Sequence, residues 1–73
     1  MEATFSNQTE EWVQLFKHKD GVESANQMVE PHGRVWLTVN ANEKWSVKSP
    51  GNSDLELKVE GEDFYQIEAA DEH

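Results

Sequence analysis

Residues 33–47 read GRVWLTVNANEKWSV, and this stretch decides the fold class of the chain. Apolar residues recur at every second position on both sides of a polar turn at residues 40–43. These apolar residues are Val35, Leu37, Val39, Trp45 and Val47. A period of two is typical of strands that bury one face and leave the other in water. The stretch therefore predicts a β-hairpin, with Trp36 on the face opposite Val35 and Leu37.

Segments on both sides of this stretch carry similar strand patterns. The clearest is residues 55–59, where apolar residues alternate with charged ones. Shorter strands are predicted around residues 3–6 and at residues 64–67. Turn signals separate the segments at Lys19-Asp20-Gly21, at Pro31-His32-Gly33, at residues 49–53 and at residues 61–63.

Residues 10–19 admit two interpretations. Trp12, Leu15 and Phe16 have helical spacing behind a cap-like Thr9. The segment is short and β-enriched, however, and it ends at a turn signal, so we favour a strand. Residues 21–30 have a weaker pattern, which predicts a loop followed by a short strand.

Six or seven strands without a confident helix predict an all-β fold, either a small antiparallel β-sandwich or a partly open barrel. The 73 residues form one domain, with residues 68–73 expected as a frayed acidic tail. The expected core is Phe5, Val13, Leu15, Val29, Val35, Leu37, Val39, Trp45, Val47, Leu55, Leu57, Val59 and one of Tyr65 and Ile67, with Phe64 on the opposite face.

Composition narrows the function. The chain has no cysteine, which excludes disulfides, thiolate metal sites and cysteine nucleophiles. The first twenty residues lack the basic start and apolar run of a signal peptide, and no apolar run is long enough to span a bilayer. We therefore expect a soluble, cytoplasmic protein with no membrane partner.

Negative charge is the strongest compositional signal. The net charge is −9, and residues 54–73 alone hold eight acidic residues against one lysine. Such a field disfavours direct binding to nucleic acid or anionic membranes and favours a basic partner. The alternative interpretation is that the acidic surface only keeps a small protein soluble.

Several short motifs follow one another between residues 3 and 47. They are Phe5-Ser6-Asn7-Gln8-Thr9, Val13-Gln14-Leu15-Phe16, Asp20-Gly21, Val29-Glu30-Pro31-His32-Gly33, Leu37-Thr38 and Trp45. Their order resembles the β-domain of the von Hippel-Lindau tumour suppressor and its bacterial relatives. The resemblance implies a β-sandwich used for protein binding. The tyrosine, serine and histidine that hold hydroxyproline in that family's best-known member have no clear counterparts here, so hydroxyproline recognition is not implied.

The sequence offers little for catalysis. His18, His32 and His73 have no paired or HExxH-like spacing, so we expect no metal and no cofactor. The abundant acids lie on polar faces or in turns of a thin domain, where their pKa values should stay ordinary. No nucleophile elbow or phosphate loop is present, so an enzyme is not expected. Asn7-Gln8-Thr9 matches a glycosylation acceptor, but without a signal peptide the match carries almost no weight.

Aromatic residues are the better candidates for binding. Trp12, Phe16 and Trp36 lie, by alternation, opposite the Val and Leu residues of their own strands. Either a second small core or a homodimer interface covers them, or they form an exposed patch that binds a ligand.

Three functions fit these residues. The first is a protein-interaction module that binds a partner through an aromatic patch or an edge strand. The second is a nucleic-acid-mimicking inhibitor of the phage type, in which carboxylates meet a basic groove. The carboxylates that would stand in for phosphates are Glu56, Glu60, Glu62, Asp63, Glu68, Asp71 and Glu72, and the first four are also candidate binding residues. The third is a carbohydrate-binding domain in which a sugar stacks on Trp12 or Trp36.

Overall fold

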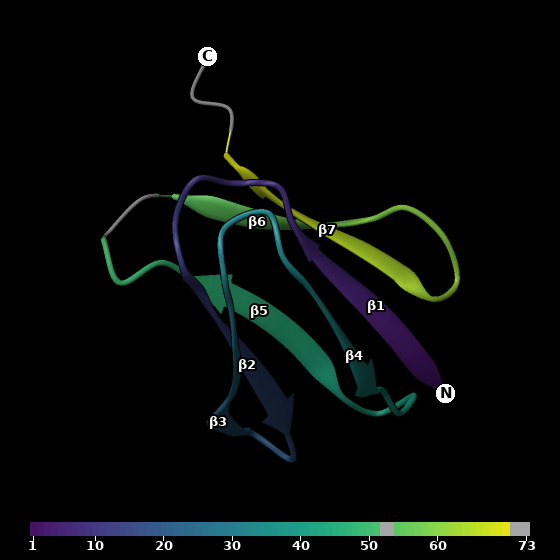
Figure 1. Cartoon of the computed structure of the whole chain (residues 1–73). Helices are drawn as coiled ribbons and strands as arrows, with labels where there is room; N and C mark the ends of the chain where they lie inside the picture. Colours follow the sequence, from purple (N-terminus) through teal and green to yellow (C-terminus); the bar gives the residue numbers. More distant parts are fainter. Residues whose placement is uncertain (52–53, 71–73) are drawn as a thin grey trace.

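Two packed sheets make up the fold (Figure 1). The computed structural model describes residues 1–51 and 54–70, and every regular element in these ranges is a strand. The seven strands are β1 (Glu2–Asn7), β2 (Val13–Lys19), β3 (Val22–Val29), β4 (Arg34–Thr38), β5 (Lys44–Lys48), β6 (Leu55–Val59) and β7 (Phe64–Ala69). Residues 1–51 and 54–70 contain no helix that is long and apolar enough to cross a membrane.

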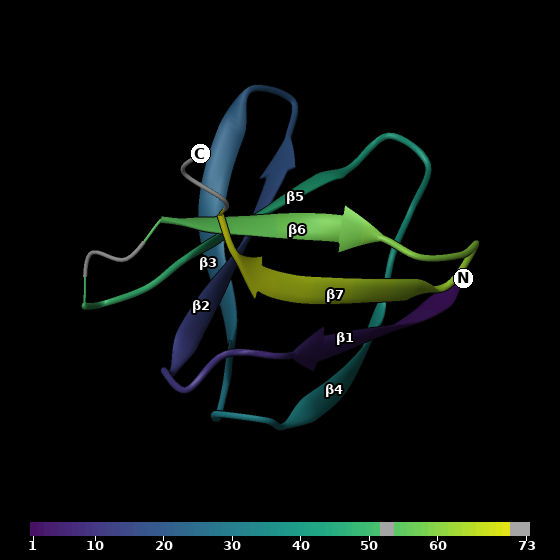
Figure 2. The same cartoon turned by 90° about the horizontal axis from the view of Figure 1, so that it is seen from above.

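The sheets contain four and three strands, in the orders β4-β1-β7-β6 and β3-β2-β5. All pairs are antiparallel except β1–β7, which is parallel. Figure 2 shows the four strands of the first sheet side by side, with β2 and β3 crossing them steeply. The sheets do not close into a barrel, although β5 contacts β6. The predicted small β-sandwich is therefore confirmed.

The predicted hairpin within residues 33–47 is wrong. Both of its strands form, but β4 pairs with β1 and β5 pairs with β2, in different sheets. Residues 39–43 therefore connect the two layers. Each strand has one apolar face, and these faces meet across the core instead of lying on the same side of one sheet. Alternation within a strand is identical in both arrangements, so it does not reveal the pairing partner.

Eight apolar side chains are buried, and most of them were expected. They are Ala3, Phe5, Val13, Leu15, Val29, Val39, Val47 and Ile67, with Val35, Leu37, Trp45, Leu55, Leu57 and Tyr65 packed against them. The Phe5 ring stacks on Tyr65 with centroids 4.8 Å apart and lies 5.2 Å from the Trp45 ring. These contacts link three strands across the two sheets.

Val59 was expected in the core, but it is 63% exposed. It pairs with Tyr65, which lines a pocket open to solvent, so the core is open beside this end of β6. Ala3 was missed, although it shares the inner face of β1 with Phe5. Phe64 is half-buried on the outer face, as expected.

Residues 21–30 form a longer strand than predicted. β3 occupies residues 22–29 and begins after a two-residue turn at Asp20 and Gly21, whose φ angles are 53° and 78°. The register of β3 against β2 shifts between Gln14 and Phe16, which marks a β-bulge. Nearly all side chains of β3 face solvent, so its sequence lacks the apolar alternation from which a strand is predicted.

Asn7 fixes the connection between the sheets. Its side chain is buried, and Nδ2 donates to the carbonyls of Glu11 at 2.7 Å, Glu30 at 3.0 Å and Val29 at 3.2 Å. Its Oδ1 accepts from the Thr9 amide at 2.9 Å and the Thr9 hydroxyl at 2.7 Å. The Asn7-Gln8-Thr9 motif is thus a structural turn, and folding closes it to a glycosyltransferase.

Part of the predicted acidic tail belongs to a strand. β7 extends to Ala69, and the Ala70 amide donates to the Asp54 carbonyl at 2.9 Å. Glu68 and Ala69 therefore belong to the sheet, where Glu68 pairs with Glu56. Residues 71–73 of the expected tail lie outside the described residues.

Candidate functional site

Trp36 lies on the outer face of the four-stranded sheet. Its neighbours Val35 and Leu37 pack against the core, so its own side chain points away and is 63% exposed. Thr4 lies opposite Trp36 on one side and opposite Phe64 on the other. Because opposite residues in a sheet share a face, these three side chains form one row across three strands.

The hydrogen-bond pattern of β1 and β4 shows which backbone groups of β4 are free. Met1 and Val39 exchange two hydrogen bonds, at 3.1 Å from the Met1 nitrogen and 2.7 Å from the Val39 amide. The Asn7 amide donates to the Gly33 carbonyl at 2.8 Å. Such pairs alternate along an antiparallel ladder. Odd-numbered residues of β4 therefore turn their backbone groups toward β1, and even-numbered residues turn theirs away.

The outward-turned residues are Arg34, Trp36 and Thr38. Among the described residues, β4 pairs only with β1 and is an edge strand of its sheet. The N–H and C=O groups of these three residues therefore point to the free edge, and all three residues are exposed. A regular edge of this kind is a template for an added strand.

The free edge of β3 is less suited to pairing. β3 carries the bulge, and its exposed residues include Glu23, Asn26 and Gln27. Bulges and charged side chains are the usual protection of an edge strand against another chain. β4 has no register shift against β1 and carries an exposed tryptophan. Of these two edges, β4 is the more regular one and the one beside an exposed tryptophan.

Trp12 and Phe16 lie on the other sheet. Trp12 directly precedes β2 and is 53% exposed, while Phe16 is half-buried on the outer face of β2. The Lys48 ammonium lies 4.8 Å from the centre of the Phe16 ring, close enough for a cation–π contact. Phe16 and Trp36 therefore lie on the outer faces of two different sheets, and Trp12 lies in the segment before β2.

Charged and polar side chains surround Phe16. His18 Nε2 lies 2.9 Å from Ser46 Oγ and 3.3 Å from Glu23 Oε1, and Lys48 Nζ lies 3.6 Å from Glu23 Oε2. These contacts cross all three strands of the sheet. They join β2, β3 and β5 on this face, and the Lys48 ammonium lies over the Phe16 ring.

The predicted carboxylates lie along β6 and the β6–β7 turn. Glu56 is exposed on the same sheet face as Trp36, although β1 and β7 separate them. Lys58 Nζ lies 3.7 Å from Glu60 Oε1. The Gln66 side-chain amide lies 2.9 Å from Glu68 Oε2 and 3.3 Å from Glu60 Oε1, and it donates to both when its nitrogen is the atom that faces them. Glu62 and Asp63 are exposed in the turn.

Charge is divided between the two sheets. The strands of the three-stranded sheet contain one acidic residue, Glu23, and four lysines. These lysines are Lys17, Lys19, Lys44 and Lys48. Residues 54–70 instead contain six acidic residues and one lysine. The strands of the three-stranded sheet are therefore basic and residues 54–70 are acidic, although the whole chain has a net charge of −9.

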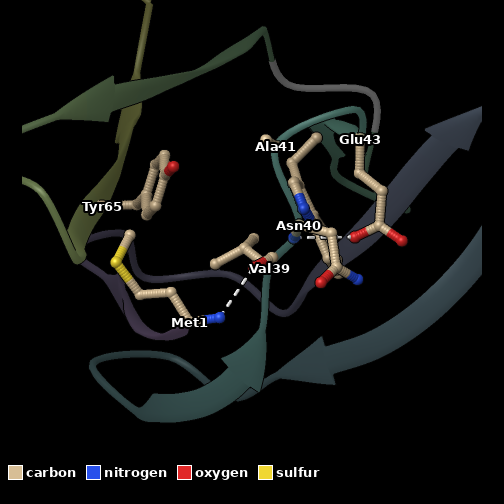
Figure 3. Close-up of a pocket in the computed structure, with 7 residues that line it drawn as sticks. Met1, Val39, Asn40, Ala41, Glu43 and Tyr65 are labelled. Atoms are coloured by element: carbon tan, nitrogen blue, oxygen red, sulfur yellow. Dashed lines mark hydrogen bonds between the residues drawn. The ribbon is translucent and has the colours of Figure 1, made fainter.

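A pocket of about 400 Å³ opens beside the connection between β4 and β5. Figure 3 shows Met1 and Tyr65 on one side of it and Asn40, Ala41 and Glu43 on the other. Its size suits a small ligand. The Glu43 carboxylate in this pocket, however, is already bound by other groups of the chain.

Glu43 is held by its neighbours. Its side chain is 3% exposed, and Oε1 accepts from the Asn40 amide at 3.1 Å while Oε2 lies 3.5 Å from Lys17 Nζ. Burial raises the pKa of Glu43, but the hydrogen bonds from Asn40 and the Lys17 ammonium outweigh it, so the pKa lies below its ordinary value. A carboxylate that stays ionised and paired suits a structural role better than proton transfer.

No metal centre is apparent in the part of the chain that the structure describes, since no three His, Cys, Asp or Glu residues converge there. His32 Nε2 lies 3.1 Å from Glu10 Oε1 at an exposed position. His73 lies outside the described residues.

The sequence patterns missed Arg34 and Thr38. Both were predicted inside a hairpin, where pairing with residues 44–47 would have consumed one edge of the strand. No local signal marks the free edge, because alternation along β4 is the same whichever strand pairs with it.

Comparisons of the chain with protein-family models, with curated proteins and with solved structures give no match.

Proposed function

We propose that this chain is a non-enzymatic protein-interaction module that binds an extended segment by strand addition at β4. The observation that carries the proposal is the exposure of Trp36 on a regular edge whose outward N–H and C=O groups are free among the described residues. The resemblance to a β-domain used for protein binding agrees with it.

The energetics favour this edge. Each backbone hydrogen bond formed at the edge contributes about 0.5–1.5 kcal/mol net. Trp36 adds a large side chain that becomes buried on contact, and tryptophan is enriched among residues that dominate binding energy. Main-chain bonds supply affinity, while Trp36 favours an apolar or cationic side chain on the added strand.

The acidic hairpin supports a second candidate, an inhibitor that mimics nucleic acid. Its six acidic residues against one lysine over residues 54–70 would face a basic groove. The two candidates differ in salt dependence. Binding through carboxylates weakens steeply between low and moderate salt, whereas strand addition at β4 depends weakly on salt.

The test uses a phage-displayed library of linear peptides selected on the immobilised chain. Affinities of the selected peptides are measured for the wild type, Trp36→Ala and Thr38→Pro, with Thr38→Val and Lys44→Ala as controls. Proline at residue 38 removes an outward N–H without touching the β1 ladder. We expect at least tenfold weaker binding for Trp36→Ala and Thr38→Pro and unchanged binding for both controls. Peptides that bind all variants equally would contradict the proposal.

A further inference from the structure

We infer that the strand added to β4 is β4 of a second copy of this chain, related by a twofold axis that passes beside Trp36. The inference rests on the proposed function and names its partner. The two four-stranded sheets would join edge to edge into one continuous sheet of eight strands. The main chain, the outer face and the inner face of β4 each support it.

The backbone of β4 is self-complementary. Its outward groups belong to Arg34, Trp36 and Thr38, and Trp36 is the central residue of the strand. An antiparallel copy centred on Trp36 places Trp36 opposite its counterpart and Arg34 opposite the partner subunit's Thr38. Every outward N–H then meets a C=O of the partner subunit. This register pairs every outward N–H and C=O group of Arg34, Trp36 and Thr38 across the subunit interface.

The outer face is complementary in charge. In one copy Glu2 lies opposite Thr38, and Ser6 lies opposite Arg34. Pairing therefore produces a row that runs from Glu2 across the small Thr38 to the partner subunit's Arg34. The Cα atoms of that glutamate and arginine would be about 10 Å apart, two strand spacings, a distance that long side chains span. Arg34 makes no ion pair with any described residue of its own chain.

Trp36 gains a partner in the same arrangement. The twofold axis sets the two Trp36 side chains side by side on the outer face, between the two Arg34–Glu2 rows. Cross-strand aromatic pairs stabilise sheets. The exposure of Trp36 in the single chain is then explained by the missing subunit.

The inner face extends the core. Val35 and Leu37 are only partly buried in the single chain, although they pack against the core. In the proposed register Val35 lies opposite the partner subunit's Leu37, and these positions are the closely spaced pairs of an antiparallel ladder. Two such contacts join the cores of the subunits. Because the axis uses both β4 edges, the assembly closes as a dimer.

Sedimentation equilibrium of the full chain tests the inference between about 10 μM and about 1 mM, a range that brackets the affinity expected of a small interface. We expect the average mass to rise from 8.4 kDa toward twice that value with concentration. Thr38→Pro and Trp36→Ala should weaken dimerisation at least tenfold, and Thr38→Val should leave it unchanged.

A charge exchange tests the register itself. Glu2→Arg and Arg34→Glu should each weaken dimerisation, and the double variant should restore it to within about threefold, because the pair is rebuilt with reversed signs. Circular dichroism melting of every variant reports whether the single-chain fold is intact.

Three outcomes would overturn the inference. A mass of 8.4 kDa at all concentrations, with selected peptides still bound at β4, means that the partner is another protein and leaves the proposed function standing. A dimer that is indifferent to Thr38→Pro and to the charge exchange places the interface elsewhere. If neither peptides nor a second copy bind at β4, both the inference and the proposed function fail.

Discussion

Two hydrogen bonds join Asn40 to Glu43 at the point where the chain passes from one sheet to the other. The Asn40 amide donates to the Glu43 carboxylate at 3.1 Å, and the Glu43 amide donates to the Asn40 carbonyl at 3.1 Å. Lys17 approaches the same carboxylate from β2. Hydrogen bonds and an ion pair of Glu43 therefore hold the β4–β5 connection, and the ion pair requires an ionised carboxylate.

The pH dependence of stability should reflect Glu43. The pKa of Glu43 in the folded chain lies below the ordinary value of 4.5. The contribution of Glu43 to the free energy of unfolding is therefore complete above pH 4.5 and is lost as the pH falls through the pKa of the folded chain. Glu43→Gln should therefore lower the melting temperature at pH 7. The difference from wild type should shrink below about pH 4.5. A difference that is constant from pH 7 to pH 3 would contradict this assignment.

Asn7→Ala should destabilise the fold by about 3 kcal/mol, because three buried or half-buried carbonyls lose their donor. Asn7→Asp should cost at least as much, since a carboxylate would face those carbonyls. Urea unfolding followed by tryptophan fluorescence measures both. Asn26→Ala, at an exposed position of β3, is the control and should change stability by less than about 0.5 kcal/mol. Equal midpoints for Asn7→Ala and the control would show that the network contributes nothing.

Phe5→Ala should cost about 3–5 kcal/mol, which is enough to unfold much of a domain of this size. The ring is fully buried and stacks on Tyr65 with an interplanar angle of 7°. Phe5→Leu keeps most of the volume and should remain folded with a lower melting temperature. Near-ultraviolet circular dichroism should lose its aromatic signal in Phe5→Ala only. A native signal in that variant would contradict the packing described here.

Gly21→Ala should destabilise the β2–β3 hairpin by about 1 kcal/mol, because residue 21 has a left-handed φ of 78°. A Cβ at Gly21 would meet no atom within 4 Å, so the cost is backbone strain alone. Asp20→Asn is the control, since asparagine also accepts the left-handed conformation at residue 20. Thermal melting should separate the two variants by about 4–8 °C. A higher melting temperature for Gly21→Ala would refute the strain argument.

Alternation predicted the strands well because burial of one face imposes it locally. Residues 55–59 and 64–67 show this, and both lie in strands as expected. The prediction failed where local pattern carries no information about partners. β4 and β5 have the pattern of a hairpin, yet their pairing depends on β1 and β2, which lie far away in the sequence.

The candidate site was predictable only in part. The position of Trp36 on the face opposite Val35 and Leu37 followed from alternation, and the structure bears it out. Alternation left open whether a second core, a homodimer interface or solvent covers Trp36, and in the single chain it is exposed. The free backbone edge did not follow, because it depends on strand order. Lys17 shares the inner face of β2 with Leu15, and its approach to Glu43 depends on contact between layers. Sequence pattern alone had no means of detecting that ion pair.

The parallel pairing of β1 with β7 has a consequence for how the chain folds. Thr4 pairs with Phe64, so β1, a central strand of the four-stranded sheet, can pair with β7 only when residues sixty positions apart in the chain meet. Closing so long a loop costs entropy before any contact repays it, which predicts slow folding relative to a protein of local hairpins. During synthesis, β1 would emerge early and remain without β7 until nearly all of these residues had followed. The β2–β3 hairpin, with its two-residue turn, is the element able to form in that interval.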